Sequence, residues 1–329
     1  MILFDVITVG SNTLDAFVRT DAKFVKISDP SRKEELCLAY PLGDKILINH
    51  LEFQIGGGGT NTAVSFSRLG LKTAYLGMIG KDHNAEIVKS CLKDEKIEFL
   101  GKFEGKTGYS VILDSKARDR TILTYKGCNN NFKFSKIQQQ KLKTKWFYFS
   151  SMMSSSLDAL KELAKYASKN KIKLAFNPSQ YLVVKGMSEL KPILENTNIL
   201  ILNKKESELL TKKTNQKAIL LELKKYVKDY VIITDGADGV ICFDGKHTYS
   251  VGAKKNLRIV ETTGAGDAFS SGFTAGIIKN EDVITALKRG MVQAEQIIQD
   301  YGAKGKLLKE ATMKKLLNKD ARKIIKRVI

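Results

Sequence analysis

Residues 260–269 read Val-Glu-Thr-Thr-Gly-Ala-Gly-Asp-Ala-Phe, a stretch in which a loop turns into a helix. The small residues allow the backbone N–H groups of Gly264, Ala265 and Gly266 to point at one spot, and a helix start adds about half a positive charge there. The stretch therefore predicts a binding site for an anion. Asp267 falls in the first helical turn, where its carboxylate suits the role of proton acceptor for a hydroxyl that attacks a bound phosphoryl group. Alternatively, Asp267 only caps the helix, because aspartate is a preferred N-cap residue.

A second glycine-rich stretch, residues 55–61, reads Ile-Gly-Gly-Gly-Gly-Thr-Asn and opens a helix predicted at residues 61–69. Consecutive glycines let the backbone approach a ligand closely, and Asn61 can both donate a hydrogen bond to a hydroxyl and accept one from it. Asp15 follows the first predicted strand, residues 2–10, near the sheet edge where α/β proteins bind ligands. These residues suit a polyol. A hinge or tight turn at the glycines and a turn at Asp15 are the alternatives.

The rest of the chain alternates apolar strands with amphipathic helices. Strands are predicted at residues 74–79, 146–149, 172–176, 198–202, 230–234 and 239–243, and helices at residues 85–96, 157–168, 218–227, 267–279 and 283–299. Apolar strands separated by helices indicate an α/β fold with a doubly wound, mostly parallel sheet flanked by helices. Residues 13–55 and 105–127 interrupt this alternation with short β-rich stretches. They predict a small β lid on a single domain that spans residues 1–329.

The net charge is strongly positive. The 329 residues include 55 lysines and arginines against 35 aspartates and glutamates, which gives +20. Such a surplus attracts phosphate-bearing partners, either nucleotides or nucleic acids. It is spread over many predicted helices, is densest at residues 304–306 and 314–326, and lacks the interleaved aromatic residues of a single-strand-binding surface. A solvated, lysine-rich surface is therefore favoured over a nucleic-acid site.

Several other classes of protein are disfavoured by the sequence. No apolar run approaches the roughly 18 to 20 residues of a membrane span, and the first residues do not resemble an export signal. The four cysteines and three histidines are scattered, which argues against a disulfide framework or a zinc site and favours a reducing cytoplasm. The sequence has no dinucleotide fingerprint after its first strand. A Walker loop fails as well, because residues 101–107 have only three residues between their glycines.

The glycine motifs taken together resemble a known family. Gly10-Ser11 with Asp15, residues 56–61 leading into residues 68–70, and residues 262–267 resemble the PfkB, or ribokinase-like, family of carbohydrate kinases over nearly the whole chain. The resemblance implies an ATP-dependent sugar kinase that phosphorylates a primary hydroxyl with Mg²⁺ as cofactor. It also implies that Asp267 is the catalytic base and that the backbone of residues 264–266 holds the transferred phosphoryl group.

The resemblance further implies three groups of binding residues. For the sugar they are Asp15, Gly57, Asn61 and, from the predicted lid, Arg120. For the nucleotide they are Asn177, Thr234 and Gly236. For magnesium and phosphate they are Asn203 and Glu206, which form an Asn-x-x-Glu element.

Departures from the family pattern limit these expectations. Thr13 and Gly58 stand where ribokinases carry asparagine and lysine, so ribose is not implied as the substrate. Glu261 stands where many relatives have an aspartate near a monovalent cation, so such a cation is possible but unsupported. A nucleoside kinase of the same fold, which needs a base pocket, and a non-catalytic polyanion-binding protein remain as alternatives. Exposed β-edges of the lid would permit a homodimer.

Overall fold

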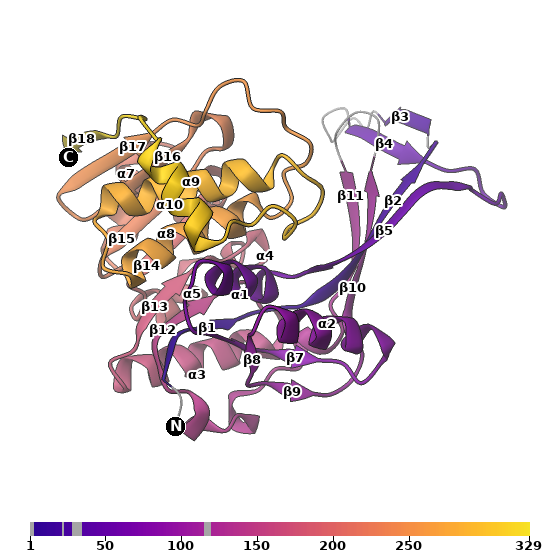
Figure 1. Cartoon of the computed structure of the whole chain (residues 1–329), viewed down its shortest axis with the longest axis horizontal. Coiled ribbons are helices and arrows are strands. Elements are labelled where there is room, and N and C mark those ends of the chain that lie inside the picture. The colour runs from indigo at the N-terminus through magenta and orange to yellow at the C-terminus, as the bar shows by residue number, and fades with distance from the viewer. Residues whose placement is uncertain (1–2, 22, 28–34, 115–119) are drawn as a thin grey trace.

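A large sheet forms the body of the protein (Figure 1). The computed structural model describes residues 3–21, 23–27, 35–114 and 120–329. In spatial order the strands of the large sheet are β18 (Ile325–Val328), β17 (His247–Val251), β16 (Val240–Phe243), β15 (Tyr230–Thr234), β14 (Ile199–Asn203), β13 (Lys173–Phe176), β12 (Thr144–Phe149), β1 (Phe4–Val9), β6 (Thr73–Leu76) and β8 (Glu98–Phe99). The strands from β15 to β8 pair in parallel, whereas β16, β17 and β18 add an antiparallel edge. The predicted mostly parallel sheet is confirmed.

Helices cover both faces of this sheet. One face packs against α1 (Gly58–Arg68), α8 (Ala265–Ile278), α9 (Val283–Ile297) and α10 (Glu310–Asn318), and the other against α3 (Ser155–Lys169), α5 (Met187–Leu194), α6 (Lys204–Thr211) and α7 (Gln216–Lys224). Neighbouring side chains of β12 serve opposite faces, because Phe147 packs with Leu160 of α3 while Tyr148 packs with Phe66 of α1. Two further helices extend these layers: α2 (His83–Asp94) packs with α1 and β6, and α4 (Gln180–Val183) packs with α5 and α6. None of the helices within the described ranges is long and apolar enough to cross a membrane.

A smaller sheet projects from the body (Figure 1). Its strands in order are β11 (Arg120–Tyr125), β10 (Gly108–Asp114), β2 (Thr13–Thr20) and β5 (Ile48–Gly56). The two-stranded hairpin β3 (Lys23–Ile27) and β4 (Glu35–Ala39) lies at its far end. The β-rich segments 13–55 and 105–127 thus supply this sheet, and β5 runs almost directly into α1.

Some elements differ from the sequence-based prediction. The helix predicted at residues 61–69 begins at Gly58, because the glycines that were assigned to the preceding loop form its first turn. The strand predicted at residues 74–79 divides at Gly77 into β6 and β7 (Met78–Ile79), since the chain there leaves the large sheet and pairs with β9 (Lys102–Phe103). Helix α10 falls in the basic C-terminal stretch, for which the sequence indicates only a surface helix of undefined bounds, and its Met313 is buried.

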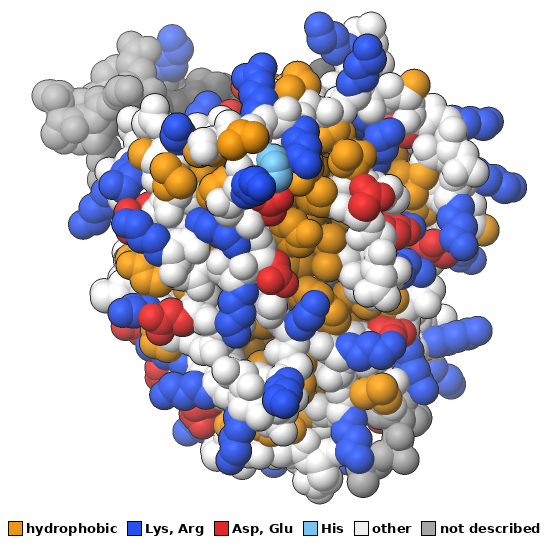
Figure 2. Space-filling view, turned by 90° about the vertical axis from the view of Figure 1, so that its left-hand side faces the viewer, with side chains coloured by type: hydrophobic (Ala, Val, Ile, Leu, Met, Phe, Trp, Pro, Cys, Tyr) orange, Lys and Arg blue, Asp and Glu red, His pale blue; other side chains and the backbone are white. Residues whose placement is uncertain are grey.

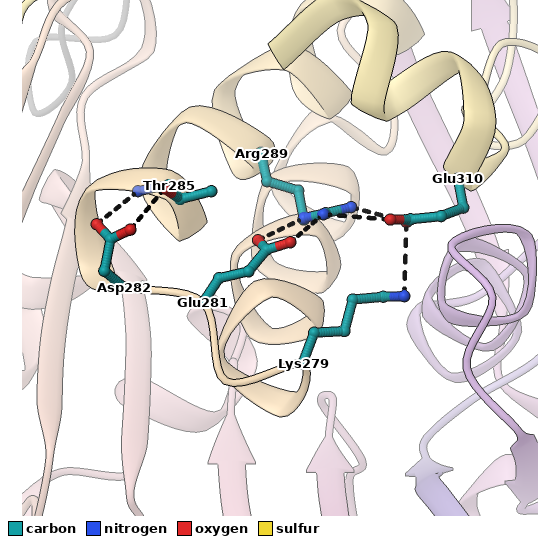
Figure 3. A network of polar contacts seen from close by, with 6 residues as sticks. All are labelled: Lys279, Glu281, Asp282, Thr285, Arg289 and Glu310. Atoms are coloured by element: carbon teal, nitrogen blue, oxygen red, sulfur yellow. Dashed lines mark hydrogen bonds and ion pairs between the residues drawn. The ribbon is translucent and has the colours of Figure 1, made fainter. Parts of the chain in front are cut away.

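A buried ion-pair cluster attaches α10 to the helix pair α8 and α9 (Figure 3). The Arg289 side chain of α9 is 1% exposed; its Nε donates to Glu281 Oε2 at 2.9 Å and its Nη1 to Glu310 Oε2 at 2.8 Å. The Lys279 ammonium lies 3.7 Å from Glu310 Oε2. Two positive charges therefore face two negative charges, which leaves no buried charge uncompensated. The cluster holds the C-terminal helix against the helix whose first turn carries Asp267.

Candidate active site

The candidate site is a cleft at the carboxyl ends of the central parallel strands. Ser11 follows β1, Ser150 follows β12 and Asn177 follows β13, and all three face Asp267 across a hollow of about 220 Å³. The full lining is Ser11, Gly58, Ser150, Ser151, Asn177, Pro178, Ser179, Glu206 and Asp267. This edge is where open α/β sheets bind ligands, since neighbouring strands end there and their loops diverge.

The glycine cluster brings the start of α1 against the loop after β1. Gly59 N donates to Ser11 O at 3.0 Å, so backbone touches backbone. Gly57 has φ 92°, and a Cβ atom placed there would lie 2.6 Å from Asn12 Cα. A side chain at this position would force the two segments apart. The glycines thus allow the start of α1 to pack closely against the loop after β1, and they can also allow a ligand to approach the backbone.

Asp267 lies in the first turn of α8 and contacts the glycine-rich segment directly. The helix begins after Gly264, which has φ 77° and is itself the N-cap residue. Asn61 Nδ2 donates to Asp267 Oδ2 at 2.9 Å, which joins two motifs that are 206 residues apart. Burial raises the pKa of Asp267, while the hydrogen bond from Asn61 and the charge of Lys304 oppose this rise. The alternative that Asp267 merely caps the helix is wrong, because its carboxylate engages Asn61 and lines the cleft.

Lys304 completes this cluster, although sequence reasoning did not single it out. Its Nζ donates to Asn61 Oδ1 and to the backbone oxygen of Ile55. Removal from water, only partly offset by nearby carboxylates, lowers the pKa of Lys304 to about 8. The sequence alone does not distinguish Lys304 from Lys306, whose Nζ is at the surface and donates to Gln299 O at 2.9 Å.

The backbone of Lys304 is itself held in place. Arg68 Nη1 donates to Lys304 O at 2.8 Å, and Arg68 Nε lies 3.0 Å from Glu95 Oε1. Lys304 therefore reaches Asn61 from a fixed loop. Because Lys304 occupies the amide oxygen of Asn61, the amide nitrogen is the atom left to face Asp267.

Two of the predicted nucleotide and metal residues reach the same cleft as Asp267. Asn177 and Glu206 both line it, and Asn177 Nδ2 donates to Ile201 O at 2.8 Å. Glu206 forms a capping box at the start of α6, in which Glu206 N donates to Asn203 Oδ1 at 2.8 Å and Asn203 N donates to Glu206 Oε2 at 2.9 Å. Burial raises the pKa of Glu206. Asn203 thus has a clear structural role as a helix cap.

Thr234 and Gly236 lie further along the same edge. Thr234 ends β15 directly opposite Asn203, which ends β14. Gly236 opens a short 3₁₀ helix (Gly236–Asp238), and the space around it is open. These two residues do not line the cleft around Asp267 within the described part of the chain. Thr234 and Gly236 lie beside the cleft, where β15 ends next to β14.

Asp15 lies in strand β2 of the small sheet, so the alternative of a turn aspartate is wrong. It is 9% exposed, and its Oδ1 has no hydrogen-bond partner among the described residues. Its negative charge raises the pKa of both Lys126 and Lys304 against the effect of their burial, although no ion pair joins Asp15 to either lysine among the described residues. Arg120 begins β11, but its side chain lies outside the described residues.

Glu261 accepts hydrogen bonds from two neighbouring segments. Its Oε2 accepts from Gly302 N at 2.8 Å, and its Oε1 accepts from the Thr263 hydroxyl. The carboxylate thereby connects the loop before α8 to the loop that carries Lys304.

Known proteins match the chain over most of its length. The model of the pfkB family carbohydrate kinases matches residues 26–310. An uncharacterized sugar kinase of Archaeoglobus fulgidus is 28% identical over 246 residues, which is 73% of this chain and 97% of that protein. The adenosine kinase of Saccharomyces cerevisiae is 29% identical over 269 residues, 75% of this chain and 78% of that protein. The solved structure of Arabidopsis thaliana ribokinase complexed with ribose and ATP superposes with a TM-score of 0.81 at 18% identity and covers 96% of this chain and 99% of that one.

Replacing either glycine of the α8 start with alanine tests the conformation of this loop. Gly264→Ala is expected to destabilise the fold by about 2 kcal/mol, because an L-residue at positive φ costs about 1–2 kcal/mol and its Cβ would lie 2.6 Å from Ala303 Cβ. Gly266→Ala is the matched control: its Cβ would meet open space, and alanine favours helix, so its free energy of unfolding should not fall. Urea unfolding of both variants measures the difference. Equal loss of stability in the two variants would contradict this geometry.

Proposed function

Since the chain belongs to the pfkB family of carbohydrate kinases, and is thus a sugar or nucleoside kinase, we propose that it transfers the γ-phosphoryl group of ATP to a primary hydroxyl of a small carbohydrate. The observation that carries this proposal is the contact between Asp267 and Asn61. It unites an acceptor for a hydroxyl proton, the start of α8 and the glycine-rich segment in one cleft. A phosphoryl transfer needs these parts near one another far more than it needs covalent chemistry.

We assign the proton transfer to Asp267. The substrate hydroxyl gives its proton to the carboxylate as its oxygen bonds to the γ-phosphorus, and the bond from that phosphorus to the bridging oxygen breaks to release ADP. The raised pKa of Asp267 makes the carboxylate a better base, while the hydrogen bond from Asn61 and the charge of Lys304 favour its ionised form. Backbone N–H groups at the start of α8, from Gly264 to Gly266, would face the charge on the transferred group.

The remaining predicted residues divide between the two substrates. We propose that Asp15, Gly57, Asn61 and Arg120 bind the sugar and that Asn177, Thr234 and Gly236 bind the nucleotide. The orphaned oxygen of buried Asp15 supports a hydroxyl-binding role, because a buried acceptor without a partner is costly. Asp15 also lies against the glycine cluster, since a Cβ on Gly56 would lie 1.8 Å from Asp15 Oδ2.

Magnesium fits the donors of this cleft. Glu206 and Asn177 offer oxygen atoms, which Mg²⁺ prefers, and the described residues contain no group of three or more His, Cys, Asp or Glu side chains that could hold a metal by themselves. Mg²⁺ often reaches kinases on the phosphates of the nucleotide and retains several waters. We propose that Glu206, with Asn203 supporting its loop, holds this water shell. When bound, the ion would neutralise charge on the phosphates.

We further propose that the small sheet acts as a lid over a single domain of residues 1–329. The loop after β1 leads directly into β2, and β5 leads directly into α1. A movement of the small sheet would therefore shift the segments that border the cleft. Arg19 of β2 donates to the Tyr301 hydroxyl at 2.8 Å, which ties the sheet to the loop that carries Lys304. A closed lid would keep water away from the transferred group.

We propose a cytoplasmic location, because all four cysteines are unpaired.

The second candidate is a nucleoside kinase of the same fold. The similarity to the yeast adenosine kinase favours it. A non-catalytic polyanion-binding role has less support. On the face shown in Figure 2, lysines and arginines are dispersed, with acidic side chains between them.

Asp267→Asn tests the assignment of the base. Turnover is expected to fall by about 100- to 10,000-fold, the usual contribution of general base catalysis, while ATP binding persists. Coupled ADP release with Mg²⁺ and a panel of sugars and nucleosides measures turnover, and calorimetry measures ATP affinity. Asp158→Asn, which removes an exposed carboxylate on α3, is the control and should leave both unchanged. Near-normal turnover of Asp267→Asn would refute the assignment.

The proton on Lys304 is expected to set an alkaline limit on turnover. Because the pKa of Lys304 is lowered to about 8, its positive charge is present below that pH and is lost as pH rises through it. The groups that act on this amine are Cys91, Asp15, Asp267 and Arg68. Turnover of the natural chain should therefore decline above about pH 8, whereas the Lys304→Met variant should lack this decline. At pH 7 that variant should be about 10- to 100-fold slower, as expected for a lost charged hydrogen bond.

Two controls accompany the pH profile. Lys306→Met removes a neighbouring surface ammonium and should retain both rate and profile. Cys91→Ser should also retain the decline, since burial raises the pKa of that thiol above its usual range. A decline that persists in Lys304→Met would assign it to another group.

We propose that the outer face of the small sheet forms a homodimer. Strand register places Phe53, Ala16, Val111 and Leu123 in one row, on the face opposite Asp15. Phe53 is 53% exposed and Leu123 is 57% exposed, an apolar surface that a second copy would cover.

Light scattering across a concentration series tests the homodimer. The natural chain should have twice the mass of Phe53→Glu, because a charge in an apolar interface is costly. Leu221→Glu introduces the same charge at an exposed position of α7 and should leave the mass unchanged. A natural chain that remains monomeric at all concentrations would reject the dimer.

A further inference from the structure

A second hollow adjoins the cleft of Asp267. It encloses about 140 Å³ and shares three residues, Ser11, Ser151 and Ser179, with that cleft. Its other lining residues are Lys126, Asn129, Asn130, Met152, Met153 and Tyr181. A substrate whose hydroxyl reaches Asp267 can therefore extend past these shared serines into the second hollow.

The hollow carries one positive charge and no negative charge among its lining residues. Lys126 is partly buried, and burial lowers its pKa against the opposing effect of Asp15. The described residues provide no ion-pair partner for Lys126, and its Nζ instead lies 5.1 Å from the centroid of the Tyr181 ring. A cation withdrawn from water without a close counter-ion is an unfavourable arrangement, which an anion would relieve.

The position of Lys126 is fixed by a buried asparagine. Asn129 Nδ2 donates to Lys126 O at 2.8 Å and to Asn12 O at 2.7 Å. Asn12 N donates back to Asn129 Oδ1 at 3.0 Å. The backbone of Lys126 is therefore anchored to the loop after β1, the same loop that the glycine cluster contacts, so the point from which its side chain extends is fixed relative to the cleft.

Neutral donors accompany the cation. Ser179 Oγ donates to Ser151 Oγ at 2.7 Å, which leaves the Ser151 hydroxyl hydrogen available to the hollow. A lysine ammonium flanked by hydroxyl groups is a donor set that suits a carboxylate or a phosphate.

We propose that this hollow binds an anionic substituent of the sugar, a carboxylate or a phosphate, through Lys126, so that the preferred acceptor is an acidic sugar. This inference rests on the proposed kinase function and specifies its substrate class. A nucleobase is less suited to the hollow, because Lys126 already covers one face of the Tyr181 ring and a neutral base would leave the ammonium unpaired.

The test compares acceptors and variants in one set of assays. Turnover is measured with ATP and Mg²⁺ on neutral pentoses and hexoses, aldonic and keto-sugar acids, sugar monophosphates and nucleosides. We expect one acidic class to have the highest kcat/KM in the natural chain. Lys126→Met should lower that value about 10- to 100-fold, mainly through KM, and leave neutral sugars within about threefold. Lys133→Met, which removes an exposed ammonium from the following segment, should change neither. The acids and the phosphates distinguish the two anion sources.

Binding to the inactive Asp267→Asn chain, measured by calorimetry, keeps this test independent of turnover. Loss of affinity for the acidic sugar on adding Lys126→Met supports the anion site even where the kinase proposal fails for lack of turnover. A neutral sugar or a nucleoside that is preferred by the natural chain and unaffected by Lys126→Met would overturn the inference while leaving the kinase function intact. Absence of binding by every acidic sugar would overturn it as well.

Discussion

The hydrogen bond from Asn61 to Asp267 is the contact on which the candidate site depends. It joins the first turn of α1 to the first turn of α8, two helices on the same face of the large sheet. The contact is possible only because the glycines before Asn61 let the start of α1 press against the loop after β1. A strict steric constraint on one backbone segment therefore determines the position of a carboxylate that is distant in sequence.

The negative charge of Asp267 and the positive charge of Lys304 lie on either side of Asn61. Asp267 is partly withdrawn from water, which raises its pKa, and Lys304 is partly withdrawn from water, which lowers its pKa. Asn61 stands between them, donating to one and accepting from the other. A polar bridge of this kind keeps the carboxylate oriented and accessible, whereas a direct ion pair would engage the carboxylate oxygens, one of which we propose receives the proton. The arrangement also explains why the loop of Lys304 is tied down twice, by Arg68 and by Glu261.

The two sheets have separate tasks in this picture. The large sheet positions the residues that we propose carry out the phosphoryl transfer, at the carboxyl ends of β1, β12 and β13. The small sheet contributes Asp15 and leads through β10 and β11 to Lys126, the groups that we propose face the rest of the substrate. Specificity would then reside in the smaller, more exposed sheet. This division matches the general tendency of connecting segments to carry specificity while a rigid scaffold carries the chemistry.

The sequence by itself determined the class of fold, the order of its main strands and helices, and the two glycine motifs with Asn61 and Asp267. These features are local: apolar periodicity and small residues at a helix start are visible within ten residues. Only the tertiary structure decided that Asn61 touches Asp267, that Lys304 rather than Lys306 enters the site, and that Asp15 is buried without a partner. It also decided that Asn203 caps α6 and that Lys126 occupies a hollow free of carboxylates. Such facts follow from which distant segments pack together, and one lysine in a chain with a charge of +20 has no local signal to distinguish it from the others.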